Sequence, residues 1–200
     1  MALFRLLPDP DPALSASGDG LVLRTPRMDD FEAWAELRSE SRDFLTPWEP
    51  LWSPDDLTRG AFRRRLTRYA DDIRQDQAYP LLIFSKDGMV LMGGMTFGNV
   101  RRGVARTTTL GYWMGQKYAG RGIMTRAVRL GLDFAFDTLG LRRVEAGCVP
   151  GNTASIRVLE ANGFEREGYA REYLCIAGEW KDHILYSRRK SDDISINYRA

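Results

Sequence analysis

The sequence is poor in cysteine and histidine: its 200 residues hold two cysteines and one histidine. Two thiols, Cys148 and Cys175, are too few for a disulfide framework and fit a reducing compartment, so we expect a cytoplasmic protein. The single imidazole, His183, excludes a histidine-rich zinc site, and we expect no bound metal. A catalytic triad that needs histidine would depend on this one residue.

Long apolar runs are also missing. Runs such as 81–84 are far shorter than the roughly 20 residues that a membrane-spanning helix needs. Residues 1–18 contain three prolines and no apolar segment of the kind found in signal peptides. We therefore expect no membrane partner and a flexible lead-in over 1–18.

The remaining composition is ordinary for a globular domain. Hydrophobic residues make up 44% of the chain and charged residues 28%. The net charge of +2 does not by itself indicate a polyanionic partner. After the lead-in we expect one domain over 19–190 and a tail over 191–200.

Hydrophobic periodicity predicts four helices and seven strands. The helices are expected after a cap at Asp29 or Asp30, over 54–74 with Ser53 as the N-cap, over 122–138, and from Asn152 to about 162. The strands are expected at 21–23, 79–84, 90–97, 106–114, 142–149, 164–175 and 182–187. This order predicts an α/β (α+β) fold, with helices on the faces of a mixed sheet.

The turn between the strand that ends at 114 and the helix that begins at 122 carries the first chemical signal. Gly120 and Gly122 let the backbone approach an anion without a Cβ in the way. Free amides at the start of a helix lie at the positive end of its dipole, which favours a pyrophosphate, and Lys117 and Arg121 add charge. Neither the P-loop motif nor the G-x-G-x-x-G dinucleotide motif is present, so the turn alone does not name the anion.

Three motifs, which follow one another along the chain, indicate which anion the turn binds. Residues 110–122, LGYWMGQKYAGRG, resemble the (R/Q)-x-x-G-x-(G/A) acetyl-CoA motif of the GNAT N-acetyltransferases, with Lys117 in place of the usual Arg or Gln. Residues 152–164, NTASIRVLEANGF, are similar to the N-x-x-S-x-x-V-x-E-x-x-G-F signature of the ribosomal-protein-alanine N-acetyltransferase group, the Rim-type enzymes. Residues 171–183 resemble the closing hairpin of that group. The resemblance runs from about 21 to 188.

The resemblance implies a GNAT fold, in which a mostly antiparallel seven-stranded sheet has helices on both faces and a V-shaped splay between two parallel strands, here 107–114 and 142–149. Acetyl-CoA would bind in the splay, and the acceptor amine would attack the thioester directly, without an acyl-enzyme. Cys148 is then expected to be a buried structural thiol rather than a nucleophile. The positions that the resemblance assigns to acetyl-CoA are Trp113, Met114, Lys117, Ala119, Gly120, Arg121, Gly122, Ile123, Asn152 and Ser155.

Proton transfer needs an acid for the leaving thiolate and a base for the amine. Many members of the superfamily carry a tyrosine seven residues after the asparagine, but here that position is Leu159, so Ser155 is the candidate for hydrogen bonding or protonating the sulfur. An ordinary helix serine is the alternative. For the base, Glu172 in the closing hairpin is the first candidate and Glu49 the second, whereas His183 is expected to anchor the hairpin.

The chemistry of the acceptor favours a protein N-terminus. An α-amino group with a pKa of about 7.8 is roughly one third neutral at pH 7.5, whereas a lysine near 10.4 is neutral in only about one part in a thousand. A site without a strong base therefore suits an α-amine. By resemblance, Trp48 and Trp52 border the acceptor groove.

The helix expected over 54–74 is rich in arginine. This pattern indicates either a solvated basic face or a docking surface for ribosomal RNA or an acidic partner. The arginines are Arg59, Arg63, Arg64, Arg65, Arg68 and Arg74.

Together these features predict an acetyl-CoA-dependent acyltransferase that acts on the N-terminal alanine or serine of a ribosomal protein. Two alternatives stay open. One is an acetyltransferase for a small amine, such as a polyamine, amino acid or antibiotic, and the other is a non-catalytic module that senses coenzyme A or binds nucleic acid.

Overall fold

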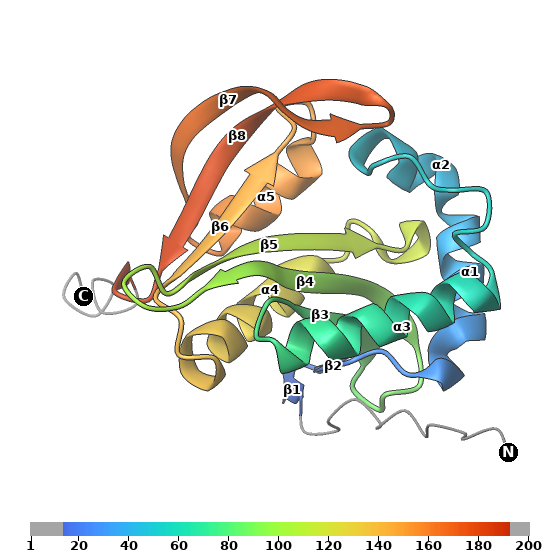
Figure 1. Ribbon diagram of the computed structural model, residues 1–200. Coiled ribbons are helices and arrows are strands. Elements are labelled where there is room, and N and C mark those ends of the chain that lie inside the picture. Colours follow the sequence, from blue (N-terminus) through green and yellow to red (C-terminus); the bar gives the residue numbers. More distant parts are fainter. Residues whose placement is uncertain (1–13, 193–200) are drawn as a thin grey trace, which may run out of the picture.

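An eight-stranded sheet runs through the computed structural model, which describes residues 14–192 (Figure 1). The strand order is β1-β2-β3-β4-β5-β6-β8-β7, and every neighbouring pair is antiparallel except β5 with β6. The strands are β1 (Ser15–Gly18), β2 (Leu21–Arg24), β3 (Tyr79–Ser85), β4 (Leu91–Arg101), β5 (Thr107–Met114), β6 (Arg143–Cys148), β7 (Glu165–Ile176) and β8 (Glu179–Arg189).

The helices cover both faces of this sheet, because each has one apolar stripe to bury. On one face Phe62 of α3 packs against Phe31 and Trp34 of α1, over β3 and β4. On the other face α4 packs with α5 into the larger core, with Ala127 and Val128 fully buried. The helices are α1 (Phe31–Glu40), α2 (Arg42–Leu45), α3 (Arg59–Arg74), α4 (Ile123–Asp133) and α5 (Thr153–Ala161); a π-helical turn, Phe134–Thr138, continues α4.

The GNAT-type mixed fold predicted from the sequence is confirmed, with one strand more than the seven expected. Ser15–Gly18, placed in the flexible lead-in, instead forms β1 and pairs with β2. The turn between them has positive φ at Asp19 (51°) and Gly20 (76°), the hairpin geometry that an Asp-Gly pair favours. Residues 1–13 of the lead-in and 193–200 of the tail lie outside the described residues.

The helix predicted from Pro54 begins five residues later, at Arg59. Thr58 is the N-cap, and its side chain accepts a hydrogen bond from the Ala61 amide at 3.2 Å. Ser53, the predicted cap, instead donates to Asp55, and the segment before the helix forms turns. Within the described chain, no helix is long and apolar enough to cross a bilayer.

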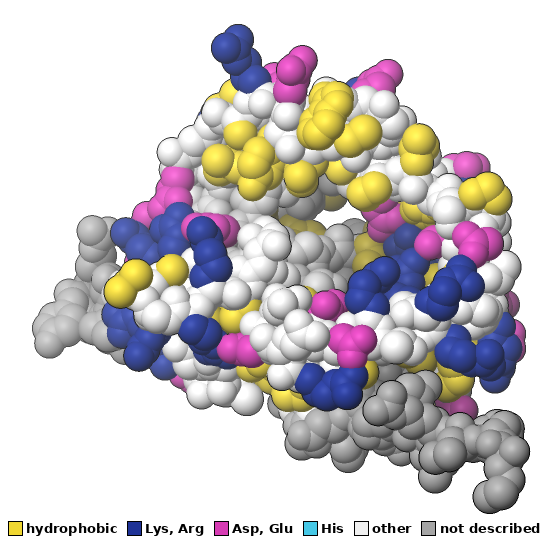
Figure 2. Space-filling model, viewed as in Figure 1, with side chains coloured by type: hydrophobic (Ala, Val, Ile, Leu, Met, Phe, Trp, Pro, Cys, Tyr) yellow, Lys and Arg dark blue, Asp and Glu magenta, His cyan; other side chains and the backbone are white. Residues whose placement is uncertain are grey.

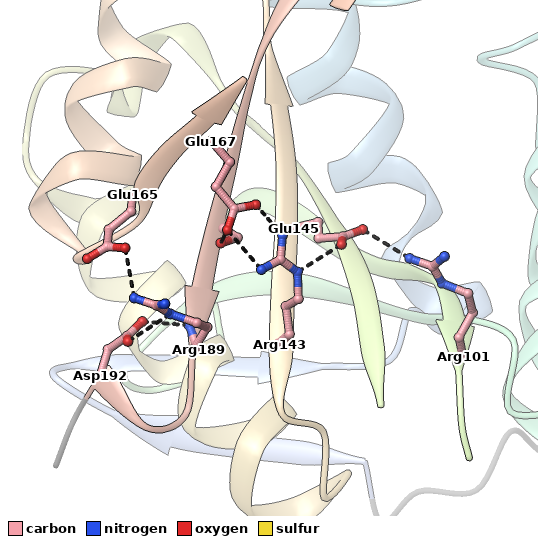
Figure 3. Close-up of polar contacts among 8 residues, drawn as sticks. Arg101, Arg143, Glu145, Glu165, Glu167, Arg189 and Asp192 are labelled. Carbon is pink, nitrogen blue, oxygen red and sulfur yellow. Dashed lines mark hydrogen bonds and ion pairs between the residues drawn. The ribbon is translucent and has the colours of Figure 1, made fainter. Parts of the chain in front are cut away.

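The two parallel strands are joined only at one end. β5 and β6 pair from Thr107↔Arg143 to Thr109↔Glu145 and then diverge (Figure 1). Ion pairs across β4, β6 and β7 hold this joined end, because Arg143 bonds both Glu145 and Glu167, and Arg101 bonds Glu145 (Figure 3). The network therefore fixes the hinge from which the splay opens.

Candidate active site

The turn before α4 presents free backbone amides. Gly120 (φ +71°) and Gly122 (φ +69°) adopt left-handed conformations, and an added Cβ at either would meet nothing within 4 Å. Within residues 14–192, the amides of Gly120, Arg121, Gly122 and Ile123 have no backbone acceptor. Donors that lack partners at a helix N-terminus suit an anion, so the geometry fits the predicted pyrophosphate site.

The two cations of this turn differ in their surroundings. Lys117 is exposed and bonds Glu40 of α1 at 2.9 Å, which raises the pKa of its ammonium group. Arg121 is exposed and makes no hydrogen bond or ion pair with any described residue. Arg121 is therefore the cation available at the turn without breaking another interaction.

At the splay, the free edge of β5 runs from Leu110 to Met114. The side chain of Trp113 packs against the α1–α3 cluster, and that of Met114 lies in the core beside α4. At these two positions the backbone rather than the side chain is therefore available to a ligand in the splay, as expected for an extended pantetheine arm.

Helix α5 places a hydroxyl group beside the splay. The Asn152 side chain caps the helix by accepting from the Ser155 amide at 3.0 Å, and the Ser155 hydroxyl lies 2.8 Å from the Tyr112 hydroxyl of β5. Cys148 is buried nearby, and burial raises the pKa of its thiol, so it is a poor nucleophile. Leu159 is only 1% exposed and packs in the core.

A groove of about 410 Å³ opens on the α1–α3 side of the sheet. Buried Arg38 forms one of its walls and bonds both oxygens of Glu49, at 2.8 and 2.7 Å. The guanidinium group lies over the rings of Trp52 (4.2 Å) and Trp113 (4.9 Å), and the Trp52 indole also donates to Glu49 at 2.8 Å. Three donors thus hold Glu49 in place, which makes it a wall of the groove rather than a free base.

The β7–β8 hairpin closes the site from above. Figure 2 shows hydrophobic side chains along it and a hollow below, and its exposed apolar residues include Tyr173 and Trp180. His183 anchors the hairpin, as expected: it is buried, its ring lies 5.5 Å from that of Tyr173, and its Nδ1 lies 2.9 Å from the Lys181 carbonyl oxygen. The hairpin tip reaches the groove wall, because the Ala177 amide donates to the Glu49 carbonyl oxygen at 2.8 Å.

Two predicted residues lie outside the groove lining. Trp52 lines the groove, but Trp48 and Glu172 do not. Glu172 is exposed on β7 at φ +48°, where the strand pairing is irregular, and its amide donates to Asp182 at 2.9 Å. Its role as the base stays a prediction.

Most of the arginines on and near α3 are already paired with acids. Arg59 bonds Glu32, and Arg64 and Arg65 bond the aspartates of the segment before the helix. Arg74 bonds Asp71 in the preceding turn of the helix. This pairing reduces the positive charge that the helix offers to a polyanion, and the RNA-docking surface stays a prediction.

Sequence reasoning gave no role to Arg38 or Tyr112. Arg38 lies on α1 among ordinary helix residues, so no motif marked it. Tyr112 lies inside the quoted acetyl-CoA motif, but it gains its partner only when α5 packs beside β5. Placing the strand of the first motif beside the helix of the second would have predicted the contact of Tyr112 with Ser155. No feature of the sequence near Arg38 predicts its contact with Glu49.

The site and the sheet place the chain in a known family. Residues 20–165 match the family model of the acetyltransferase (GNAT) domain. The chain therefore belongs to the GNAT acetyltransferases and is an N-acetyltransferase.

Several proteins with named activities are similar to this chain over most of its length. The chain is 37% identical to the probable N-acetyltransferase YjcK of Bacillus subtilis, over 88% of this chain and 97% of the relative. It is 35% identical to the ribosomal protein uS5-alanine N-acetyltransferase of Escherichia coli, over 87% and 90%. Among solved structures, RimJ of Mycobacterium smegmatis in complex with CoA-disulfide has a TM-score of 0.82 at 34% identity, covering 86% of this chain and 83% of RimJ.

A second solved structure has the same fold as this chain. The ribosomal-protein-S5-alanine acetyltransferase of Vibrio fischeri has a TM-score of 0.82 at 31% identity, covering 90% of this chain and 98% of the other. The prediction of a GNAT enzyme similar to the ribosomal-protein-alanine group is therefore confirmed.

Proposed function

We propose that this protein transfers the acetyl group of acetyl-CoA to the N-terminal α-amino group of a ribosomal protein that begins with alanine or serine. The observation that carries the proposal is the arrangement of two sites along one strand, β5. Free amides in the turn that follows β5 fit a pyrophosphate, and a groove with aromatic walls is lined by Tyr112 and Trp113 of the same strand. The relatives named for ribosomal-protein-alanine acetylation support the choice of acceptor.

Acetyl-CoA would supply the activated acetyl thioester. The amides from Gly120 to Ile123 and the Arg121 guanidinium would hold its diphosphate, and the free edge of β5 would align the arm that leads to the thioester. Because the two strands diverge only beyond Thr109, that arm has backbone donors and acceptors to pair with along one side.

The acceptor would enter through the groove beside Trp52. Aromatic walls exclude water and hold an extended peptide, while Arg38 and Glu49 keep the walls rigid. The groove carries balanced charge, because Arg38 and Arg65 lie opposite Glu49 and Asp56. A polycation would gain little there, which favours a peptide N-terminus over a polyamine.

The proton balance requires two groups. The α-amine loses one proton as it attacks, and Glu172 is the proposed acceptor, through water because it lies outside the groove lining. The departing thiolate of coenzyme A gains one proton from Ser155, the proposed donor, and Ser155 regains a proton from water when coenzyme A leaves. An α-amine that is partly neutral at pH 7.5 needs little help from a base.

The proposal is tested with a thiol-release assay on the purified protein and acetyl-CoA. The acceptors are a peptide with N-terminal alanine, the same peptide with a blocked N-terminus and an internal lysine, and spermidine. We expect release of coenzyme A with the first peptide alone. Release with spermidine alone would replace the ribosomal acceptor with a small amine, and no release with any amine would favour a sensor.

The natural acceptor is identified in cells. Mass spectrometry of ribosomal proteins from a deletion strain should show one N-terminus that is lighter by the mass of one acetyl group. Re-expression of the wild-type gene should restore that mass, and re-expression of a Ser155→Ala variant should restore little of it. Unchanged ribosomal proteins in the deletion strain would contradict the proposed acceptor.

A further inference from the structure

Tyr112 is a partly buried polar residue of β5 that packs against the larger core and lines the groove. Its hydroxyl oxygen lies 2.8 Å from the Ser155 hydroxyl and 3.3 Å from the Ser155 carbonyl oxygen, and it has no other hydrogen-bond partner in the part of the chain that the structure describes. We propose that Tyr112 is a positioning residue for acetyl transfer: its hydroxyl donates to Ser155 Oγ and so directs the Ser155 proton toward the thioester sulfur. The inference rests on the proposed role of Ser155.

The direction of the hydrogen bond between the two hydroxyl groups decides where the Ser155 proton points. A serine hydroxyl carries one proton and can accept hydrogen bonds in its other directions. If Ser155 donated to Tyr112, its only proton would point away from the substrate. If Tyr112 donates, the Ser155 proton stays free for a second acceptor, and the Ser155 oxygen is held in place.

The surroundings of both groups favour the second arrangement. The Tyr112 phenol stays protonated at any physiological pH, because burial raises its pKa. Its one proton has two acceptors, the Ser155 hydroxyl oxygen at 2.8 Å and the Ser155 carbonyl oxygen at 3.3 Å, and the hydroxyl oxygen is the nearer. The helix cap fixes the backbone of Ser155, because the Ser155 amide donates to the Asn152 side chain at 3.0 Å. Ser155 is thus held from its backbone by α5 and from its hydroxyl by β5.

The geometry argues against Tyr112 as the proton source. Its hydroxyl carries one proton, and both hydrogen-bond partners of that hydroxyl, at 2.8 and 3.3 Å, are oxygens of Ser155, so the proton is directed to Ser155 and not to the substrate. Tyr112 therefore orients the donor instead of replacing it.

A double-mutant cycle tests the inference. Tyr112→Phe removes one oxygen, and we expect kcat to fall about tenfold with little change in KM for acetyl-CoA, the effect of losing one orienting hydrogen bond. Ser155→Ala should lower kcat about a hundredfold. In the double variant, the loss should equal that of Ser155→Ala alone, because Tyr112 acts only through Ser155.

The matched control is Tyr186→Phe. Tyr186 is a buried tyrosine of the core against which Tyr112 packs; it lies on β8, and no hydrogen bond of its hydroxyl is found within the described residues. It should keep normal kcat and a melting temperature close to that of Tyr112→Phe. Additive losses in the double variant, or normal kcat in Tyr112→Phe, would overturn the inference.

A second measurement covers the case in which Tyr112→Phe does not fold. A crystal structure of the wild-type protein with coenzyme A should show the Tyr112 oxygen bonded to Ser155 Oγ, and Ser155 Oγ within about 3.5 Å of the sulfur. A Tyr112 oxygen bonded to the sulfur itself would overturn the positioning role. Failure of the proposed function is separate, since it would appear as a wild-type protein that acetylates no amine.

Discussion

Replacing Gly120 with alanine should weaken the binding of coenzyme A at the turn before α4 more than it destabilises the fold. Gly120 has φ +71°, and an added Cβ would meet no atom within 4 Å. The methyl group therefore causes no clash in the protein itself. It forces a left-handed alanine, which costs about 1 kcal/mol and lowers the melting temperature by about 3 °C in a domain of this size.

The effect on binding should be larger than the effect on stability. If the Gly120 amide donates to a diphosphate oxygen, the methyl group moves the anion away from that donor. Loss of one hydrogen bond to a charged acceptor is worth about 1.5–3 kcal/mol, so we expect the Kd for coenzyme A to rise roughly 10- to 100-fold. Isothermal titration calorimetry measures this change, and thermal denaturation measures the strain.

Gly103→Ala is the matched control. Gly103 has φ +64° and equally open surroundings, but it lies in the turn before β5, at the opposite end of that strand from Gly120. Both variants should lose the same stability, and only Gly120→Ala should lose affinity. Equal affinities for coenzyme A in the two variants would refute the placement of the diphosphate at this turn.

Three further predictions concern the groove, the buried thiol and the hinge. Arg38→Ala leaves the Glu49 carboxylate partly buried without its main partner, so the free energy of unfolding should fall by about 3 kcal/mol in urea denaturation, and a loss below about 1 kcal/mol would contradict the role of the pair. Cys148 should react with iodoacetamide at pH 7.5 far more slowly than exposed Cys175, because burial raises the pKa of the Cys148 thiol; equal labelling by mass spectrometry would show that the core opens. Arg143 lowers the pKa of the Glu167 carboxyl from 4.5 to about 2. The stability that this ion pair contributes is therefore complete above pH 4.5 and is lost as the pH falls through 2. Because this side chain is 40% exposed, Glu167→Gln should cost only about 1 kcal/mol at pH 7, and a difference from wild type that is as large at pH 2 as at pH 7 would contradict the ion pair.

Elements with local signals could be predicted from the sequence. The turn at Gly120 and Gly122, the cap at Asn152 and the apolar stripe of α4 were all predicted, because each depends on residues within a few positions of one another. The misplaced start of α3 shows the limit of such rules. Ser53 and Thr58 are both acceptable caps, and the choice was made by the segment between them, whose aspartates bond Arg64 and Arg65.

The sequence by itself determined the family and the order of the elements from β2 to β8, because these are encoded in short motifs and periodic patterns. Only the tertiary structure decided which side chains meet. Tyr112 and Ser155 are 43 positions apart, and Arg38 and Glu49 are joined through a loop that the β7–β8 hairpin holds in place. Such contacts depend on strand register and on the packing of helices across the sheet, which arise from interactions summed over the whole chain rather than from any one segment.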